Sequence, residues 1–334
     1  MPCPRELREN AEEFLIGPYG LLSKNSRGRA RPETPCQLRT CFQRDVDKIT
    51  HAKAFRRLKH KTQVFLQPEG DHYRTRLTHT LEVTRIARTI SRALQLNEDL
   101  TEAIALGHDL GHTPFGHAGE RAIREIYPPG FHHYEQSLRV VDLIEKDGRG
   151  LNLCYETRMG ILHHTHGAPD DIPEAVTVRL SDKIAYINHD LDDALRAGIL
   201  TLSDLPPIVL ERIGQRHSER LNTIITDLIE NSQDGELKMS PDMSEAVDIF
   251  HDFMYANVYL NSTAKREESK VSNIISGIWE YYVNYPEKLP PEYSAIAEAE
   301  GLPRAICDYV SGMTDTFAIR KYSEIFIPAA WMVY

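Results

Sequence analysis

The sequence has little of what defines several classes of protein. Its five cysteines are odd in number and scattered, and none forms a C-x-x-C pair. This argues against a disulfide framework or a structural zinc site and suits a reducing compartment. No run of 18 or more apolar residues occurs, so we expect no membrane span. With 19 glycines and 19 prolines in 334 residues, the chain is not of the low-complexity or collagen-like class.

Positive charge is scarce outside the N-terminal third. The first 92 residues hold 19 Lys+Arg and 10 Asp+Glu, whereas the rest holds 20 and 39, for a net charge of −10. A basic segment of this kind favours binding of a nucleotide, a phosphate or a nucleic acid. Arg27, Arg29 and Arg31 would equally suit a solvated loop. The first 20 residues lack a signal-peptide pattern, which predicts a cytoplasmic protein.

Histidine is abundant and clustered. Of 15 histidines, 13 lie between His51 and His189. Histidine is the commonest metal ligand and titrates near neutral pH, so this crowding indicates chemistry in that region. The three histidines in residues 163–166 precede Gly167, and we predict that they lie in a solvated loop.

Apolar residues recur at helical spacing along almost the whole chain, which predicts an all-α protein. Breakers separate the units, but none is long enough for an interdomain linker, which favours a single large helical domain. We assign a basic, partly disordered segment to residues 1–40, a core to 41–200 and a C-terminal helical extension to 201–334. A short extended segment is predicted at Lys61–Leu66. The predicted helices are Asp45–Lys61, Thr78–Leu94, Glu98–Leu110, Glu135–Glu145, Glu174–Ala197, Ile208–Ile229, Ser244–Ala256, Val271–Tyr282 and 302–319.

The stretch 107–120 contains the most informative motif. His108 and Asp109 end an apolar helix and are followed at once by the breakers Gly111, Pro114 and Gly116. At such a helix end, an imidazole and the adjacent carboxylate can converge on one ion. A mixed histidine and carboxylate set suits Mn²⁺, Fe²⁺, Zn²⁺ or Ni²⁺, whereas imidazole favours Mg²⁺ less.

Further ligands have to come from other helices. His79 stands near the start of one predicted helix, and Asp182 stands inside another. Asp182, Tyr186 and Asp190 are four residues apart in turn and therefore share a helix face. Burying a carboxylate in an apolar helix is costly unless it has a partner, and a metal ion would be such a partner.

The ordered set His79, His108-Asp109 and Asp182 resembles the H…HD…D signature of the HD-domain metal-dependent phosphohydrolases. Flanking sequence narrows the resemblance to the deoxynucleoside triphosphate triphosphohydrolases, and most to the bacterial dGTPase-like proteins. The matching stretches cover nearly the whole chain. They are Phe55–Leu58, Lys61–Val64, Thr75–His79, His108–His117, Asp182–Tyr186, Asn188–Ala194 and Asp308–Asp315.

The resemblance implies an HD-domain helical fold with additional C-terminal helices. It implies cleavage of a deoxynucleoside triphosphate at the α-phosphorus, which gives a deoxynucleoside and inorganic triphosphate. It also implies one divalent metal ion (Mn²⁺, Mg²⁺, Fe²⁺, Ni²⁺ or Zn²⁺) and a homo-oligomer, often a hexamer. The implied metal ligands are His79, His108, Asp109 and Asp182.

The resemblance assigns proton transfer to His117, whose ring Glu120 can orient from three residues on. The positions matched to phosphates are Arg76, His112, His133 and Lys183, and those matched to the sugar are Gln63, Tyr186 and Asp190. Alternative roles stay open for several of these residues: a capped helix start for His117 with Glu120, a supporting polar role for His112 and His133, and a core position for Tyr186.

Three functions are therefore compatible with the sequence. The first is a triphosphohydrolase that acts on dGTP or on dNTPs generally, because base contacts are not readable. The second keeps the metal but makes the protein a nucleotide phosphomonoesterase or phosphodiesterase. The third is a nucleotide-sensing or single-stranded nucleic-acid-binding protein, motivated by the basic N-terminal third. Product identification separates the first two, and salt-dependent binding to single-stranded DNA tests the third.

Overall fold

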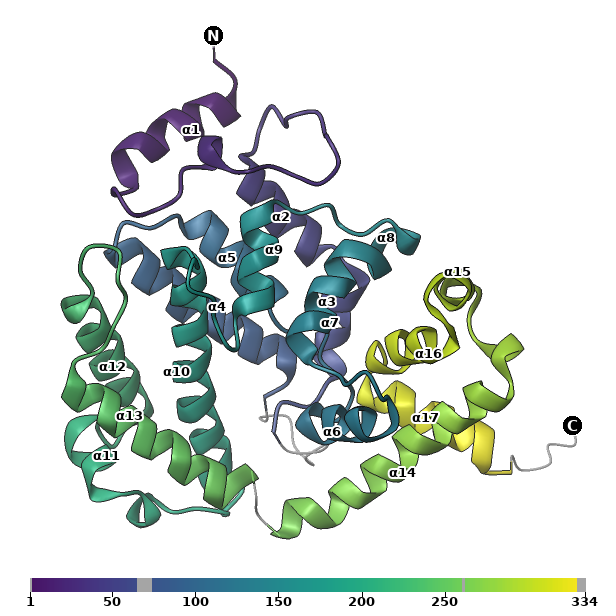
Figure 1. The fold of residues 1–334 in the computed structure, drawn as a ribbon. Coiled ribbons are helices and arrows are strands. Elements are labelled where there is room, and N and C mark those ends of the chain that lie inside the picture. Colours follow the sequence, from purple (N-terminus) through teal and green to yellow (C-terminus); the bar gives the residue numbers. More distant parts are fainter. Residues whose placement is uncertain (1, 65–73, 260–261, 329–334) are drawn as a thin grey trace, which may run out of the picture. The chain divides into compact units, whose positions relative to one another are not determined.

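The computed structural model describes residues 2–64, 74–259 and 262–328 (Figure 1). Within these ranges all regular elements are helices, and strand pairing is limited to isolated bridges such as Thr62 with Thr75. The prediction of an all-α protein is therefore confirmed. Residues 65 and 66 of the predicted extended segment lie outside the described residues. In the part of the chain described, no helix is long and apolar enough to cross a membrane.

The chain forms two compact units, each assembled from separate stretches of sequence. Unit 1 comprises Met1–Ala52, Thr78–His108 and Leu151–Asn261, and unit 2 comprises Lys53–Leu77, Asp109–Gly150 and Ser262–Tyr334. The proposed segments 1–40, 41–200 and 201–334 follow different boundaries and stay a prediction.

Unit 1 is organised around α10, an uninterrupted helix that packs against α5, α9, α12 and α13 (Figure 1). Its core is mainly aliphatic, and Leu100, Ile104, Ile161 and Ile184 are fully buried. The helices of this unit are α1 (Pro4–Leu15), α2 (Cys41–Thr50), α4 (Arg76–Ala93, from Thr78 onward), α5 (Glu98–Gly107), α9 (Tyr155–His163), α10 (Pro173–Arg196), α11 (Pro207–Arg212), α12 (His217–Asn231) and α13 (Pro241–Met254).

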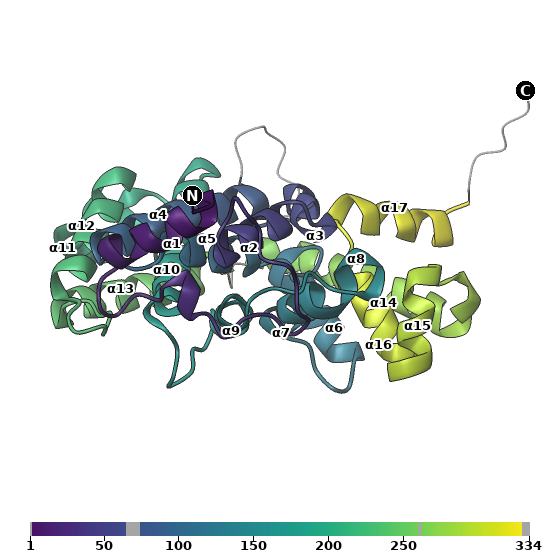
Figure 2. The ribbon, with the colours of Figure 1, turned by 90° about the horizontal axis from the view of Figure 1, so that it is seen from above.

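Unit 2 is held together by an apolar cluster to which α6, α14 and α16 contribute Ile123, Ile275 and Ile306. The long helix α14 packs against α6, α16 and α17, and Figure 2 shows α15 and α16 side by side. The helices are α3 (Lys53–Arg57), α6 (Gly116–Ile126), α7 (His133–Arg139), α8 (Glu145–Gly148), α14 (Ser262–Asn284), α15 (Pro291–Glu300), α16 (Leu302–Ser311) and α17 (Asp315–Phe326), with a π-helical turn at Val140–Ile144.

Three helices predicted as continuous are broken. The first, predicted at Asp45–Lys61, is divided between α2, which ends at Thr50, and α3, which begins at Lys53. The second, Ile208–Ile229, is divided at Gly214, whose φ of 121° only glycine adopts readily. The third, 302–319, is divided because Thr314 caps α17, its side chain accepting a hydrogen bond from the backbone of Phe317 at 3.2 Å. Apolar spacing alone does not reveal such local breaks.

Candidate metal centre and histidine cluster

The two candidate histidine ligands of unit 1 lie near helix ends. His108 is the C-cap residue of the buried apolar helix α5, and His79 lies in the first turns of α4. Both side chains are buried, with 1% and 2% of their surface exposed. The Nδ1 of His108 is 2.6 Å from the carbonyl oxygen of Ala105, so this nitrogen carries the proton. The Nε2 therefore holds the lone pair that a metal requires.

Asp182 brings a carboxylate to these two imidazoles from α10. Its Oδ1 lies 2.9 Å from Nε2 of His79 and 3.8 Å from Nε2 of His108. Three side chains from α4, α5 and α10 thus converge within unit 1, and the helical spacing that carries Asp182 also places Tyr186 and Asp190 on its face of α10.

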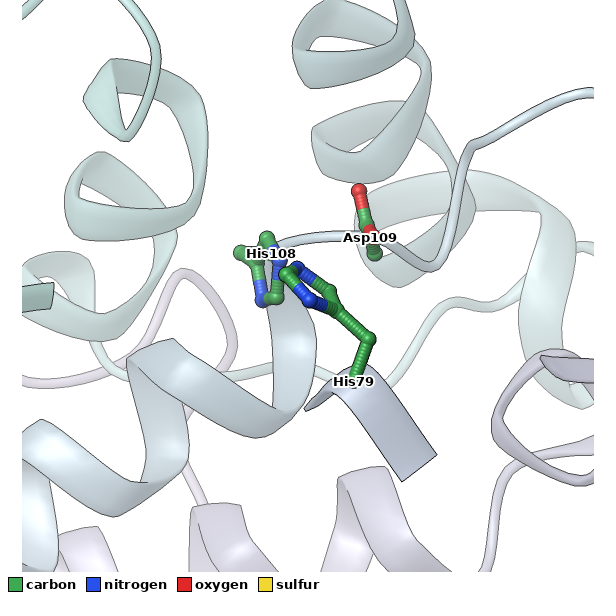
Figure 3. Close-up of side chains that lie close together, drawn as sticks. All are labelled: His79, His108 and Asp109. Carbon is green, nitrogen blue, oxygen red and sulfur yellow. The ribbon is translucent and has the colours of Figure 1, made fainter. Parts of the chain in front are cut away.

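Asp109 is the fourth predicted ligand and follows His108 directly in the chain. Figure 3 shows the imidazoles of His79 and His108 near one another with the carboxylate of Asp109 beside them. One potential ligand atom from each of these three side chains lies within 4.8 Å of the other two. Asp109 also accepts a hydrogen bond from Arg76 at 2.7 Å, and both side chains are buried.

The donor set fits a divalent first-row metal. A pair of ligands about 2.1 Å from an ion and at right angles to each other is about 3.0 Å apart, and the 2.9 Å from His79 to Asp182 matches this. The Nδ1 of His79 is buried without a hydrogen-bond partner among the described residues, so the ring is held chiefly through Nε2. Two imidazoles and two carboxylates suit Mn²⁺, Fe²⁺, Zn²⁺ or Ni²⁺ better than Mg²⁺.

Unit 2 gathers a second group of titratable side chains. Glu120, in the first turns of α6, is nearly buried, and its Oε2 lies 3.2 Å from Nδ1 of His133 and 3.7 Å from Nδ1 of His117. Burial opposes ionisation of Glu120, but the neighbouring imidazoles of His117 and His133 outweigh it and lower the pKa of this carboxyl. Glu120 is therefore an anion that lies against both imidazole rings.

His112 also belongs to this group, but its imidazole is buried and neutral. Its ring stacks on that of His133, with the centroids 4.8 Å apart. Both ring nitrogens are buried without a hydrogen-bond partner among the described residues. Burial lowers the pKa of His112 well below its ordinary value, and the charges of Arg76 and His133 lower it further. A buried, neutral imidazole with both nitrogens unsatisfied is suited to bind a polar ligand.

The buried state of His112 should make folding stability depend on pH. The unfolded chain protonates this residue near pH 6.5, whereas the folded chain keeps it neutral. Its contribution is therefore complete above about pH 6.5 and falls below that by up to ~1.4 kcal/mol per pH unit. We expect His112→Gln to reduce the loss of unfolding free energy between pH 7 and pH 5.5, measured with urea in the presence of a chelator. His51→Gln, at an exposed site, is the control. Equal losses in all three proteins would contradict this account.

The remaining predicted contacts are divided between the units. In unit 2, Gln63 is buried, and its Oε1 has no hydrogen-bond partner among the described residues. In unit 1, Asp190 is fully buried and Tyr186 is half-buried. The Nζ of Lys183 lies 2.7 Å from the carboxylate of Asp248, so this cation has an exposed ion-pair partner.

The predicted place of His164 in a solvated loop is wrong. Its side chain is 2% exposed, and its ring centroid lies 5.1 Å from that of His108. Like His108, it is the C-cap residue of its helix, here α9, and its Nδ1 is 2.8 Å from the carbonyl oxygen three residues earlier. The sequence feature that could have indicated this burial is Ile161 on the preceding turn, because its side chain packs in the core and His164 follows it on the same side.

Comparison with known proteins agrees with this geometry. Residues 76–187, which contain all four proposed ligands, match the HD domain, and residues 237–324 match the phosphohydrolase-associated domain. HD domains are helical and bind divalent metals, so the fold and the donor set define an HD-domain phosphohydrolase.

Several relatives match almost the whole chain. A protein of Caldanaerobacter subterraneus subsp. tengcongensis is 52% identical over 328 residues, which cover 98% of this chain and 97% of its own. One of Desulfatibacillum aliphaticivorans is 47% identical, covering 97% and 98%, and one of Clostridium tetani is 45% identical, covering 97% and 96%. Each is named deoxyguanosinetriphosphate triphosphohydrolase-like protein. The chain belongs to this family of hydrolases.

Proposed function

We propose that this protein hydrolyses deoxynucleoside triphosphates to a deoxynucleoside and inorganic triphosphate, with water attacking the α-phosphorus. The observation that carries the proposal is the convergence of His79, His108 and Asp182 in unit 1, in a chain whose relatives carry the dGTPase-like name. A divalent cation bound there would polarise a phosphoryl oxygen and lower the pKa of a water molecule.

Proton transfer falls to His117 and Glu120. Nearly half of the His117 side chain is exposed, so a substrate can reach it, and the carboxylate of Glu120 lies against its ring. Glu120 can orient the His117 ring, which can then pass a proton to the departing 5′-oxygen of the deoxynucleoside. His133 shares the same carboxylate and holds it in place from α7.

The leaving triphosphate needs positive charge and hydrogen-bond donors. Arg76 is a buried cation of unit 2, and part of its charge is balanced by Asp109. The neutral ring of His112 can donate one hydrogen bond, and Lys183 in unit 1 can move from Asp248 to an incoming phosphate because that ion pair is exposed. These residues supply contacts that strengthen as charge develops on the leaving group.

Discrimination against ribonucleotides is assigned to Tyr186, with Asp190 and Gln63 contacting the 3′-hydroxyl. A ring that occupies the place of a 2′-hydroxyl rejects it by steric clash and by offering it no hydrogen bond. We expect Tyr186→Ala to lower the ratio of kcat/KM for a dNTP over its rNTP by about 10-fold or more. Tyr186→Phe, which keeps the ring, should preserve the ratio. An unchanged ratio in the alanine variant would remove Tyr186 from the sugar site.

Single-stranded DNA binding and assembly into a homo-oligomer stay predictions. The guanidinium of Arg27 lies 3.6 Å from the ring centroid of Tyr155, and Arg29 is buried against Asp45. Arg27 and Arg29, in the basic N-terminal third that motivated a nucleic-acid function, therefore have partners inside unit 1. Binding to single-stranded DNA that weakens steeply with salt would support this additional function.

A metal-supplemented assay of each dNTP and each rNTP, with identification of every product, tests the proposed function. Tripolyphosphate and a free deoxynucleoside are expected. Orthophosphate or pyrophosphate as the only inorganic product would instead support a phosphomonoesterase or another phosphohydrolase. Comparing the four dNTPs decides between a dGTPase and an enzyme of general specificity.

A further inference from the structure

The backbone that leads into α6 adopts a conformation that needs external support. Phe115, the N-cap of α6, has φ 63° and ψ 23°, and Gly116 has φ 59°. A bulky side chain rarely adopts this left-handed region, and such a residue persists only where its surroundings impose it. His117 and Glu120 follow in the first turns of the helix, so the turn at Phe115 fixes where both begin.

The support comes from Asp315, far away in the sequence. Asp315 is the first residue of α17, and its side chain is 2% exposed. Its Oδ1 accepts a hydrogen bond from the backbone N–H of Phe115 at 2.8 Å. Its Oδ2 accepts one from the backbone N–H of Thr62 at 2.9 Å and a second, shorter one from the Thr62 hydroxyl. A single carboxylate thus ties α17, residue 62 and the start of α6 together.

Lys61, the residue before Thr62, supports the segment that leads into the turn at Phe115. Lys61 is buried, and its Nζ donates to the carbonyl oxygen of Ser311 at 3.0 Å and, over a shorter distance, to that of His112. The segment from His112 to Phe115 is therefore held at both ends. Ser311 and Asp315 flank the break between α16 and α17, so the residues at this break bind both Lys61 and the backbone of Phe115.

We propose that Asp315 is a positioning residue for the hydrolysis, setting the turn at Phe115 and through it the placement of His117 and Glu120. Asp315 lies within the phosphohydrolase-associated domain, residues 237–324, so this domain contributes directly to the geometry of the HD domain's histidine cluster. The effect on catalysis rests on the proposed function. The effect on the geometry of His117 does not.

The carboxylate is specific because all its partners donate. An asparagine at 315 has the same shape but turns one acceptor into an NH₂ donor that faces another donor. Asp315→Asn therefore breaks one side of this support without opening a cavity. Misplacing a reacting group by about 1 Å can cost about 10²-fold in rate. We expect Asp315→Asn to lower kcat by about 10-fold or more, with KM changed by less than about threefold.

Asp308 provides a matched control in the same unit. It is also a buried carboxylate of the C-terminal helices, but it accepts hydrogen bonds from the side chains of Gln136 and Arg139, at 2.8 and 3.0 Å, and from that of Arg304. Asp308→Asn should lower the Tm while the folded enzyme keeps its kcat. Thr62→Ser, which retains both donors, should have wild-type kcat. Thr62→Val loses only the hydroxyl and should lie between wild type and Asp315→Asn.

The imidazole resonances of ¹⁵N-histidine-labelled protein give a readout without turnover. The His117 signals should move in Asp315→Asn and not in Asp308→Asn. If they stay in place, or if kcat falls only in proportion to the folded fraction in both variants, Asp315 is merely structural and the inference is wrong. If no protein yields tripolyphosphate but the His117 signals still move, the positioning is supported and it is the proposed function that fails.

Discussion

Replacing Asp182 with alanine is expected to remove the bound metal and to lower kcat by about 10³-fold or more. Asp182 supplies the carboxylate that lies 2.9 Å from His79 and 3.8 Å from His108, so the variant leaves two imidazoles of unit 1 without their shared anionic partner. A cation held by two neutral imidazoles and only one carboxylate, that of Asp109, would bind more weakly, and the activation of water that it would supply would be lost with it. Metal content measured by inductively coupled plasma mass spectrometry should fall from one ion per chain to nearly none.

Asp192→Ala is the matched control on the same helix. Its carboxylate is partly exposed and forms a long ion pair with Arg196 at 3.5 Å, one turn further along α10. This variant should keep both the metal and the activity. A metal content of one ion per chain in Asp182→Ala, together with normal turnover, would show that the ligand assignment is wrong.

Replacing His117 with alanine should abolish proton transfer while leaving the metal bound. Positioned acid/base groups typically contribute about 10²- to 10⁴-fold, so we expect kcat to fall by that factor with little change in metal content. The half-exposed ring lies outside the core, so circular dichroism and Tm should remain close to those of the wild type. The comparison with Asp182→Ala separates the two roles, because only that variant loses the ion.

His132→Ala provides the control for a lost imidazole in the same unit. Its ring stacks on Tyr134, with the centroids 5.2 Å apart, and has no assigned part in the reaction. This variant should retain activity. If the His117→Ala enzyme had the wild-type kcat, the general acid or base would have to be another group, and Glu120 would have only a structural function.

The helical fold class and the helix positions of the candidate ligands could be predicted because they depend on short-range patterns. The helical period of residues 173–196 by itself places Asp182, Tyr186 and Asp190 on one face of α10. An apolar helix that ends at Gly107 carries His108 to the edge of the core. Both features follow from the geometry of a single helix and need no knowledge of what packs against it.

Other parts of the site depend on contacts that leave no trace in the sequence. Two of the partners of Asp315 are backbone N–H groups, which every residue type except proline provides, so no residue pattern marks them. The burial of His164 depends on how α9 packs against α5. The breaks at Gly214 and Thr314 result from local backbone and capping preferences that the apolar period does not register.

Hydrolysis in H₂¹⁸O is the most direct test of the central claim, the attack of water on the α-phosphorus. The attacking oxygen must remain on the α-phosphorus, and the 5′-oxygen must leave with the deoxynucleoside. Mass spectrometry of a single-turnover reaction should find one ¹⁸O in the tripolyphosphate and none in the deoxynucleoside. Label in the deoxynucleoside, or label in orthophosphate or pyrophosphate without labelled tripolyphosphate, would contradict the account.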